Sequence, residues 1–261
     1  MDSEKARLLR SYHHEGPVLV LPNAWDVASA VVIAKAGARV VASTSAGVAW
    51  ALGHPDGQRI ARAEMIDMVR RIAAAVDVPV TADVEGGYGD VPATVAEVVA
   101  AGAVGVNLED GIARGEPLRD VEEQAELLRA ARATSSEVVI NARTDVFLFQ
   151  QGGVTDVVKR GAAYAEAGAD CLFVPGLVDV AVIREIVDAV PLPVSAMAVP
   201  GGPGVAELAE AGVRRISVGP ALSAGAYEFA HAAAARLLAD GVLPDMGKQI
   251  GFPQLNSWLA G

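Results

Sequence analysis

The chain has 261 residues, of which 52% are hydrophobic, a formal net charge of -11 and a single cysteine, Cys171. Its length and apolar content support one hydrophobic core, so we expect a single domain over residues 1–261. The acidic balance argues against a nucleic-acid-binding protein, which needs clustered Lys and Arg to neutralise phosphates. One cysteine excludes an intrachain disulfide and argues against a zinc-thiolate cluster.

Membrane insertion and secretion are not indicated by the sequence. No apolar run of about 18 residues lacks an interruption by charge, Gly or Pro, so we expect no transmembrane helix and no membrane partner. The opening stretch, MDSEKARLLRSYHHEG, is charged and has no apolar core of the kind found in signal peptides. We therefore expect a cytoplasmic protein.

Short β-rich runs alternate with longer Ala-rich helical runs along the chain. The predicted strands are Val18–Leu21, Arg39–Ser43, Val78–Asp83, Gly105–Leu108, Val138–Ala142, Cys171–Val174, Pro193–Ala196 and Arg215–Val218. Four of the helical runs end in Ala-Gly just before the next strand, at residues 36–37, 101–102, 167–168 and 211–212. Glycine accepts the left-handed conformation that ends a helix, so this dipeptide marks a recurring connection.

Eight such alternations in about 220 residues predict an α/β protein with a (β/α)8 TIM-barrel fold. The alternative is an open doubly wound sheet. Its dinucleotide-binding form is disfavoured because no Gly-x-Gly-x-x-Gly follows the first strand.

Residues 221–261 follow the eighth strand as a helix and a tail. The helix either closes the bottom of its own barrel, or the whole segment is an oligomerisation arm that packs on a neighbouring subunit. Pro244 and Pro253 interrupt the tail. Because proline cannot continue a helix, they predict an extended arm with one short final turn.

Polar and charged residues follow several predicted strands at their carboxyl ends, where a barrel carries its active site. They are Ser43, Thr44, Ser45 and Gly47 after the second strand, Asp83 and Glu85 after the third, Glu109 and Asp110 after the fourth, and Arg143 and Asp145 after the fifth. Acidic residues and one arginine are therefore predicted to converge on one rim.

This combination of residue types suits a metal site beside an anion site. Carboxylates from Asp83, Glu85 and Glu109 are the oxygen ligands that a hard divalent cation prefers. Mg²⁺ takes only one or two carboxylates directly and keeps several waters, so the others would act through water. Arg143 can hold a carboxylate by two parallel hydrogen bonds. The rim therefore predicts a site for a small 2-oxo acid or di-acid.

Structural interpretations of the same residues stay open from sequence alone. Arg143 could pair with Asp145 in a loop, and Glu109 with Asp110 could form a solvated turn. Aspartate after a strand is often a helix N-cap, and Asp90 and Asp120 are interpreted in that way.

Several ordered segments carry a family resemblance. LPNAWDVASAVVIAKAGARVVASTSAGVAWALGHPDG, VPVTADVEGGYGD, GVNLEDG and INARTDVFL together resemble the isocitrate lyase and phosphoenolpyruvate mutase superfamily, including its carboxyphosphonoenolpyruvate phosphonomutase and methylisocitrate lyase branches. The resemblance covers most of residues 17–220. It implies a barrel that binds Mg²⁺ or Mn²⁺ and cleaves or rearranges bonds next to a 2-oxo or enolate carbon. It also implies a homodimer or homotetramer in which partners swap the eighth helix.

The resemblance also assigns roles to individual residues. The implied metal residues are Asp83, Glu85 and Glu109, with Glu85 standing where many members have a second aspartate. The implied catalytic residues are Arg143, Glu109 and Asp56, and the implied substrate-binding residues are Ser43, Ser45, Gly47 and Arg143.

Two departures from the family pattern bear on the reaction. Lyases of the superfamily that act on isocitrate or methylisocitrate carry a Lys-x-Cys-Gly-His loop, which is replaced here by GIARGEPLRD. Cys171 cannot substitute, because it lies within a predicted strand. Mutases and phosphonopyruvate hydrolases carry Lys directly after Glu-Asp, where this chain has Gly111. Three nearby residues remain further candidates for catalysis: His54, Arg114 and Glu116.

The sequence and the resemblance together predict an Mg²⁺- or Mn²⁺-dependent carbon–carbon lyase or decarboxylase. Its substrate would be a small 2-oxo or 2-hydroxy carboxylate, cleaved through an enolate. The alternatives are a phosphoenolpyruvate or phosphonopyruvate mutase or hydrolase, and a barrel that binds a ligand without catalysis.

Overall fold

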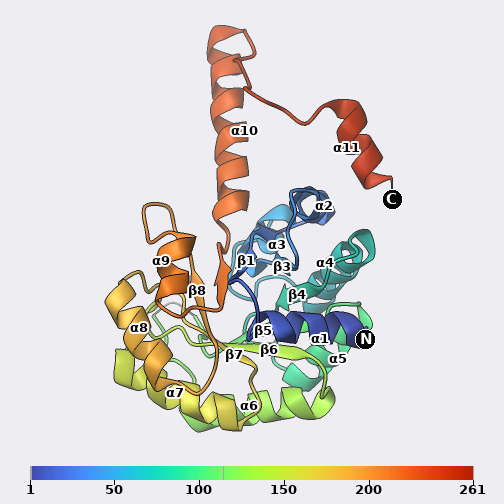
Figure 1. Ribbon diagram of the computed structural model, residues 1–261. Coiled ribbons are helices and arrows are strands. Elements are labelled where there is room, and N and C mark those ends of the chain that lie inside the picture. The colour runs from blue at the N-terminus through green and yellow to red at the C-terminus, as the bar shows by residue number, and fades with distance from the viewer. Residues whose placement is uncertain (1, 114, 261) are drawn as a thin grey trace.

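A computed structural model of the chain describes residues 2–113 and 115–260 and shows nine parallel strands in one sheet (Figure 1). The strands are β1 (Leu19–Leu21), β2 (Asn23–Ala24), β3 (Val41–Ser43), β4 (Val80–Asp83), β5 (Gly105–Glu109), β6 (Val139–Arg143), β7 (Cys171–Phe173), β8 (Val194–Met197) and β9 (Arg215–Ser217). Their order, β1-β9-β8-β7-β6-β5-β4-β3-β2, brings the first and last strands together. The TIM-barrel prediction is confirmed, and the open doubly wound sheet was wrong.

The predicted first strand, Val18–Leu21, corresponds to β1, and the unpredicted β2 follows it after Pro22, which has no N–H to donate to a ladder. β1 pairs with β9 and β2 pairs with β3. Asn23 joins the two sides at the break, because its Nδ2 donates to the carbonyl of Ser43 at 2.9 Å and its Oδ1 accepts from the N–H of Val218 at 2.9 Å. One amide side chain thus replaces the interrupted ladder and closes the barrel.

Helices lie around the sheet, and one long helix extends away from it (Figure 1). They are α1 (Ser3–Tyr12), α2 (Val27–Lys35), α3 (Ser45–Ala51), α4 (Arg62–Ala75), α5 (Val91–Ala100), α6 (Val121–Thr134), α7 (Val154–Glu166), α8 (Val180–Ala189), α9 (Val205–Glu210), α10 (Ala221–Asp240) and α11 (Phe252–Leu259). Asp90 and Asp120 accept backbone N–H groups at the starts of α5 and α6, so their N-cap interpretation is confirmed. The glycines of the four Ala-Gly connections all have positive φ, as predicted. No helix in the described part of the chain has the length and apolar character needed to span a membrane.

Successive residues of each strand point in opposite directions. One set faces a core inside the barrel, and the other faces the larger core between the strands and the helices. Helix α1 closes the amino-terminal end of the barrel, where Leu9 is fully buried against Leu19 and Val139. Gly105 is required at this point, because a Cβ there would lie 2.8 Å from the Leu9 side chain. The opposite end of the barrel stays open for polar side chains.

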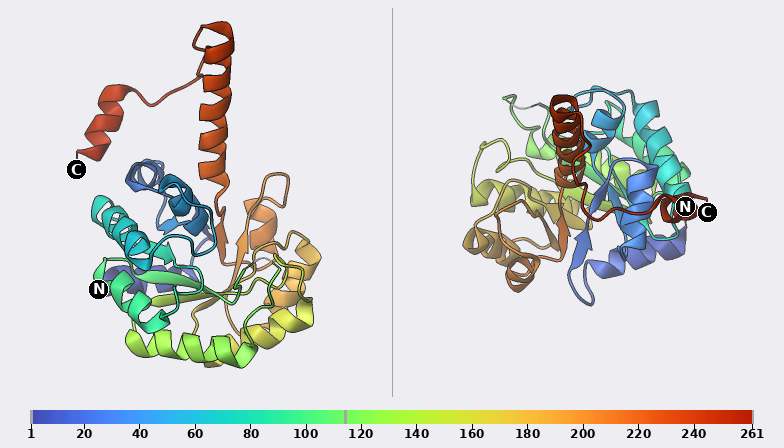
Figure 2. Two further views of the ribbon diagram at one scale, coloured as in Figure 1. Left: turned by 180° about the vertical axis from the view of Figure 1, so that it is seen from behind. Right: turned by 90° about the horizontal axis from the view of Figure 1, so that it is seen from above.

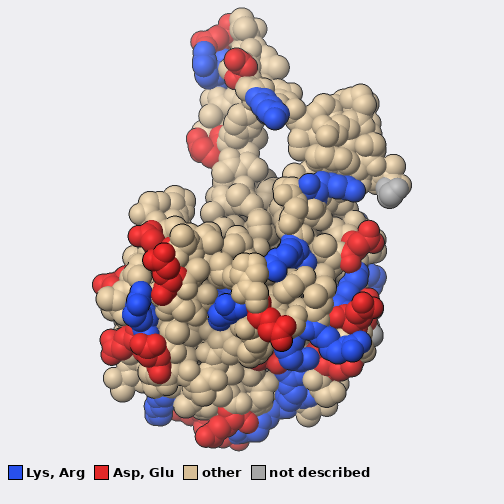
Figure 3. Space-filling model, viewed as in Figure 1, with Lys and Arg blue, Asp and Glu red and all other residues tan. Residues whose placement is uncertain are grey.

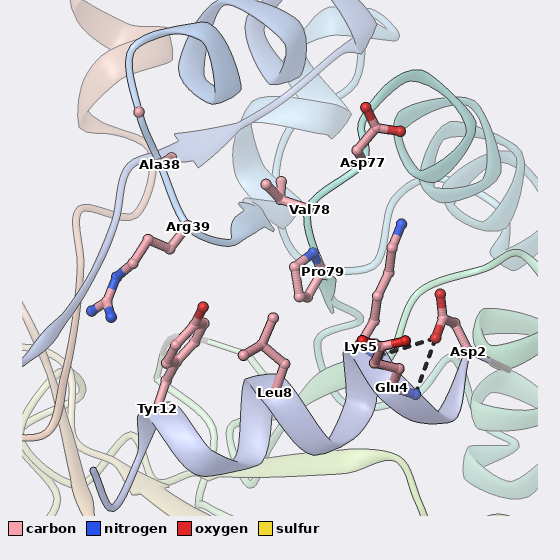
Figure 4. A pocket seen from close by; sticks show the side chains of 11 residues that line it. Asp2, Glu4, Lys5, Leu8, Tyr12, Ala38, Arg39, Asp77, Val78 and Pro79 are labelled. Carbon is pink, nitrogen blue, oxygen red and sulfur yellow. Dashed lines mark hydrogen bonds between the residues drawn. The ribbon is translucent and has the colours of Figure 1, made fainter. Parts of the chain in front are cut away.

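A surface cavity of about 550 Å³ lies beside α1, at the amino-terminal ends of β3 and β4 (Figure 4). Its wall combines Leu8, Tyr12 and Pro79 with the guanidinium of Arg39, which lies 4.5 Å from the centre of the Tyr12 ring. TIM-barrel enzymes carry their active sites at the other end of the strands. This cavity is therefore separate from the predicted site.

Helix α10 rises away from the barrel, and a segment without helix or strand leads from it to α11 (Figures 1 and 2). Side chains of α10 are mostly exposed, including Phe229 at 53% and Leu238 at 86%. On the face shown in Figure 3, charged residues gather on the barrel and few lie on α10. Helix α11 returns to contact α2 of the same chain, with Trp258 half-buried. The predicted final turn is thus an eight-residue helix with Pro253 in its first turn.

The buried His13 generates a prediction for stability against pH. Burial, and then the charge of Arg215, lower the pKa of His13 from 6.5 to about 3. Between these values the unfolded chain binds a proton that the folded chain excludes, so stability falls as pH drops below about 6.5. We expect a loss of about 1.4 kcal/mol between about pH 7.5 and about pH 5.5 from this group.

Urea unfolding of the wild type and of His13→Gln at both pH values measures this contribution. The pH-dependent loss should be smaller by that amount in His13→Gln, whereas His14→Gln, at an exposed position, should behave like the wild type. An identical pH dependence in His13→Gln and wild type would show that folding does not lower the pKa of His13.

Exposed apolar side chains on α10 and α11 generate a prediction for assembly. Phe229, Leu238 and Phe252 need a surface that covers them, so we propose that residues 221–261 contact a second copy in a homodimer or homotetramer. Light scattering should find an oligomer for the full chain and a smaller species for a chain that ends at Asp240. A monomeric full chain at micromolar concentration contradicts the proposal, and an oligomeric truncated chain places the interface elsewhere.

Candidate active site

The carboxyl ends of β4, β5 and β6 and the loops around them enclose a cavity of about 410 Å³. Its polar lining is Ser45, Asp56, Gly57, Arg59, Glu85, Glu109 and Arg143, and its apolar lining is Ile112, Ala113, Leu148 and Phe149. Five of the residues singled out from sequence thus share one cavity at the predicted end of the barrel.

Asp83 ends β4 and is held by the neighbouring strand and helix. Its Oδ2 accepts the N–H of Ser45 at 3.2 Å and the Ser45 hydroxyl at 2.9 Å, and its own N–H donates to the Ser43 hydroxyl at 2.9 Å. Ser45 is the first residue of α3, so Asp83 takes the place of an N-cap side chain, which Thr44 does not supply. Ser45 therefore fixes the carboxylate that the resemblance assigns to the metal, and the Ser43 hydroxyl fixes the backbone that carries it.

Glu85 ties two loops together from a strained backbone position. Its φ of 51° lies in the left-handed region, which is uncommon for residues other than glycine. Its carboxylate accepts the N–H groups of Gly57 at 3.2 Å and Gln58 at 3.0 Å, and the Gln58 side chain accepts the N–H of Tyr88 at 3.0 Å. Burial, together with nearby Asp83, raises the pKa of Glu85 to about 7, although the Gln58 N–H opposes this shift.

Arg143 lies between two carboxylates at the end of β6. Its Nη1 is 2.7 Å from Glu109, and its Nε and Nη2 are 2.6 and 3.2 Å from the two oxygens of Asp145. Burial raises the pKa of Glu109 well above its usual range despite Arg143, because Asp145, Asp83 and Glu85 add negative charge. The structural pairing of Arg143 with Asp145 is therefore present, and Glu109 joins it.

Asp110 is fully buried, so the interpretation of Glu109-Asp110 as a solvated turn was wrong. One oxygen of Asp110 accepts the N–H of Asp145 at 2.9 Å. The other accepts the Tyr164 hydroxyl at 2.8 Å and Arg160 Nη1 at 2.9 Å. Asp110 thus fixes the loop after β6 to the end of β5 and to α7.

Arg119 joins the segments that carry Glu85 and Glu109. Its Nη1 donates to the carbonyl of Glu109 at 2.9 Å and its Nη2 to the carbonyl of Gly86 at 3.4 Å. A Cβ at position 86 would lie 2.7 Å from the guanidinium, so glycine is needed for this close approach. The arginine thereby links the backbones of the two segments that carry these acidic residues.

A second arginine lies inside the barrel, one layer below the carboxylates. Arg215 on β9 is 1% exposed and donates to Asn107 at 3.0 Å, and Asn107 also accepts from Asn141 at 2.8 Å. Burial lowers the pKa of Arg215 to about 10, so it stays charged at neutral pH. The floor of the site is therefore a polar layer with one positive charge.

Other predicted residues lie outside the cavity wall. Gly47 is buried in α3, where a Cβ would come within 2.8 Å of Thr44 and Trp25. The absence of a side chain at Gly47 thus allows Thr44 and Trp25 to pack closely against this turn of α3. Cys171 is buried in β7, as predicted. His54 and Glu116 are exposed, and Arg114 lies outside the described residues.

Part of the cavity wall was not predicted from the sequence. The residues concerned are Arg59, Ile112, Leu148 and Phe149 in the wall itself, and Arg119, which donates a hydrogen bond to the carbonyl of Glu109. Arg59 could have been found from its place three residues after Asp56, in a loop already singled out. The apolar residues carry no such signal, because only the fold brings their loops together.

Comparison with known proteins identifies the group to which this site belongs. A model of the phosphoenolpyruvate phosphomutase family matches residues 9–238. The chain belongs to this family. An uncharacterized protein of Mycobacterium tuberculosis is 40% identical over 232 residues, 88% of each chain. The 2,3-dimethylmalate lyase of Eubacterium barkeri is 34% identical over 170 residues, which cover 60% of this chain and 58% of the lyase.

Solved structures of the superfamily share the fold over nearly the whole chain. A putative phosphonomutase from Burkholderia cenocepacia J2315 is 44% identical with a TM-score of 0.84, covering 89% of this chain and 99% of that one. Oxaloacetate acetylhydrolase bound to 3,3-difluorooxalacetate is 28% identical with a TM-score of 0.89, covering 99% and 94%. The resemblance to the isocitrate lyase and phosphoenolpyruvate mutase superfamily is confirmed, and the relatives with named activities include lyases and mutases.

The donor set at the family site fits a hydrated divalent cation. The negative charge of Asp83 helps to raise the pKa of both Glu85 and Glu109, and a bound cation would relieve this repulsion. Within the described residues, no three Asp, Glu, His or Cys side chains converge tightly enough to bind one ion together. Mg²⁺ needs only one or two protein carboxylates, with water in the other positions.

Asp83→Asn tests which carboxylate holds the cation. Asparagine keeps the size of the side chain and one acceptor for Ser45 but loses the charge, so we expect Mg²⁺ or Mn²⁺ binding to be lost in calorimetry. Asp90→Asn is the matched control, because Asp90 caps α5 and is exposed. Wild-type cation affinity in Asp83→Asn would show that another group is the main ligand.

Proposed function

We propose that the chain is an Mg²⁺- or Mn²⁺-dependent lyase that cleaves or decarboxylates a small 2-oxo or 2-hydroxy carboxylate through an enolate. The observation that carries this proposal is the convergence of Ser45, Glu85, Glu109 and Arg143 on one cavity, with Asp83 held behind Ser45. A divalent cation would polarise the substrate oxygen and stabilise negative charge on the enolate.

The chain's own residues have separate roles in the proposed reaction. Asp83, with Glu85 and Glu109 acting through water, would hold the cation. Asp56, at the exposed mouth of the cavity, adds a further carboxylate near it. Ser43 and Ser45 orient Asp83, and the apolar wall excludes water from the carbon at which the bond breaks. The electron pair of that bond stays on the carbon that becomes part of the enolate, and this carbon later takes up a proton.

Arg143 can still bind substrate although it is paired. Guanidinium has five N–H groups, and three of them point to Asp145 and Glu109. Two remain, and the carboxylates hold them in a fixed orientation. Such a pre-oriented donor suits a carboxylate or an oxyanion that forms during the reaction.

A glycine after Glu109-Asp110 favours a lyase over a mutase. Superfamily mutases carry Lys at this place, whereas here a Cβ on Gly111 would clash with the Asp145 carboxylate and lie 3.1 Å from the Phe149 ring. Asp145 is held by Arg143 and by Asp110, so it cannot give way easily. The site therefore has no space for the mutase lysine.

The relatives agree with this class of chemistry. The oxaloacetate acetylhydrolase structures contain 3,3-difluorooxalacetate and oxalate, both small dicarboxylates. The dimethylmalate lyase is named for cleavage of a substituted 2-hydroxy di-acid. We infer a substrate of similar size, which the cavity of about 410 Å³ can enclose.

The proposal is tested by incubating the protein and Mg²⁺ with 2-oxo acids, 2-hydroxy di-acids and phosphonopyruvate, and detecting products by NMR. We expect cleavage of a member of the first two groups, lost with EDTA and in Asp83→Asn. Turnover of phosphonopyruvate alone would establish mutase or hydrolase activity instead. Ligand binding without turnover of any compound would show a non-catalytic barrel.

Arg143→Lys tests the role of the guanidinium. Lysine keeps the charge but loses the fork, so substrate binding should weaken by about 1.5–3 kcal/mol, the scale of a charge-assisted hydrogen bond. The Michaelis constant and turnover are measured beside the Tm, which reports any structural damage. Unchanged kinetics would show that Arg143 only pairs with Asp145 and Glu109.

A further inference from the structure

Arg59 differs from Arg143 in having no anionic partner. Both guanidinium groups line the cavity. Arg143 has Glu109 and Asp145 within 2.7 Å. Arg59 is exposed and makes no hydrogen bond or ion pair with any of the described residues. The charge of Arg143 is therefore already offset by protein carboxylates, while the charge of Arg59 is not.

The backbone that carries Arg59 is fixed on both sides. The preceding N–H groups, of Gly57 and Gln58, are held by the Glu85 carboxylate. The following residue, Ile60, is buried in the core at 5% exposure. Arg59 thus has an exposed side chain on a fixed backbone, at the mouth of the cavity and close in sequence to Asp56.

The wall of the cavity also includes apolar side chains. Ile112, Leu148 and Phe149 line it together with Glu85, Glu109 and Arg143. A ligand that fits this lining carries an anionic group at one end, which lies near the charged side chains. A short hydrocarbon segment follows it, and a second group at the other end reaches the rim of the cavity. An unpaired guanidinium favours an anion as that second group.

We propose that Arg59 determines specificity by binding the distal carboxylate of a dicarboxylate substrate, the one that the divalent cation does not hold. This inference rests on the proposed function, since the other carboxylate must be held at the Asp83 end of the site. Arg143 then orients the reacting end of the substrate, and Arg59 selects its length and charge.

Calorimetry in the presence of Mg²⁺ tests the assignment with three probes. Malate and 2-hydroxybutanoate have the same four carbons but differ in the distal carboxylate, and oxalate is too short to reach the rim. We expect the wild type to prefer malate over 2-hydroxybutanoate by about tenfold, which corresponds to ~1.4 kcal/mol. The preference should shrink as the NaCl concentration rises from about 0.05 M to about 0.5 M, because an exposed ion pair is screened by salt.

Arg59→Gln should abolish the preference and leave oxalate affinity unchanged, and Arg59→Lys should retain part of it. Arg184→Gln is the matched control, because Arg184 is an exposed arginine on the outer helix α8. A preference that survives in Arg59→Gln, or an equal loss of oxalate affinity, overturns the role of Arg59. If the wild type binds oxalate without preferring malate, Arg59 is likewise not the determinant and the proposed function stands. If none of the three probes binds, the proposed function fails, and this inference with it.

Discussion

The ion pairs that Arg143 makes with Glu109 and Asp145 are the interaction on which the site depends. Three charged groups are brought out of water at the ends of adjacent strands, which is costly unless each one is paired and hydrogen-bonded. The barrel supplies those partners, because Asp110 holds the backbone of Asp145 and Arg119 holds the carbonyl of Glu109. Glycine at positions 86 and 111 gives the room that these contacts need.

A second set of contacts controls the acidic side of the cavity. Asp83 is held by Ser45, and Glu85 holds the backbone of Gly57 and Gln58. Each carboxylate therefore stabilises a loop as well as carrying charge toward the proposed cation. The left-handed backbone at Glu85 is a local cost that the surrounding hydrogen bonds offset. A cation would strengthen this arrangement by reducing repulsion among the carboxylates.

The same fold gives the two ends of the chain different environments. Helix α1 closes the barrel with fully buried side chains, and it buries His13 in a position that excludes a proton. Helix α10 leaves the barrel with most of its apolar residues exposed. The apolar side chains at the amino-terminal end are thus buried within a single copy. Those of α10 form an exposed apolar surface that a second copy would cover.

The sequence by itself determined the barrel and the rim that carries its polar residues. Hydrophobic periodicity and the Ala-Gly connections are local, and each of the eight predicted strands has a counterpart in the sheet, whereas the short β2 after Pro22 was not predicted. Because parallel strands present their carboxyl ends together, the sequence also placed Glu85, Glu109 and Arg143 on one cavity. Only the tertiary structure decided what each of these groups contacts. Arg143 has two carboxylate partners and Arg59 has none among the described residues, and Asp110 is buried instead of solvated. These outcomes depend on distances between loops far apart in the chain, and no local pattern of residue types encodes those distances.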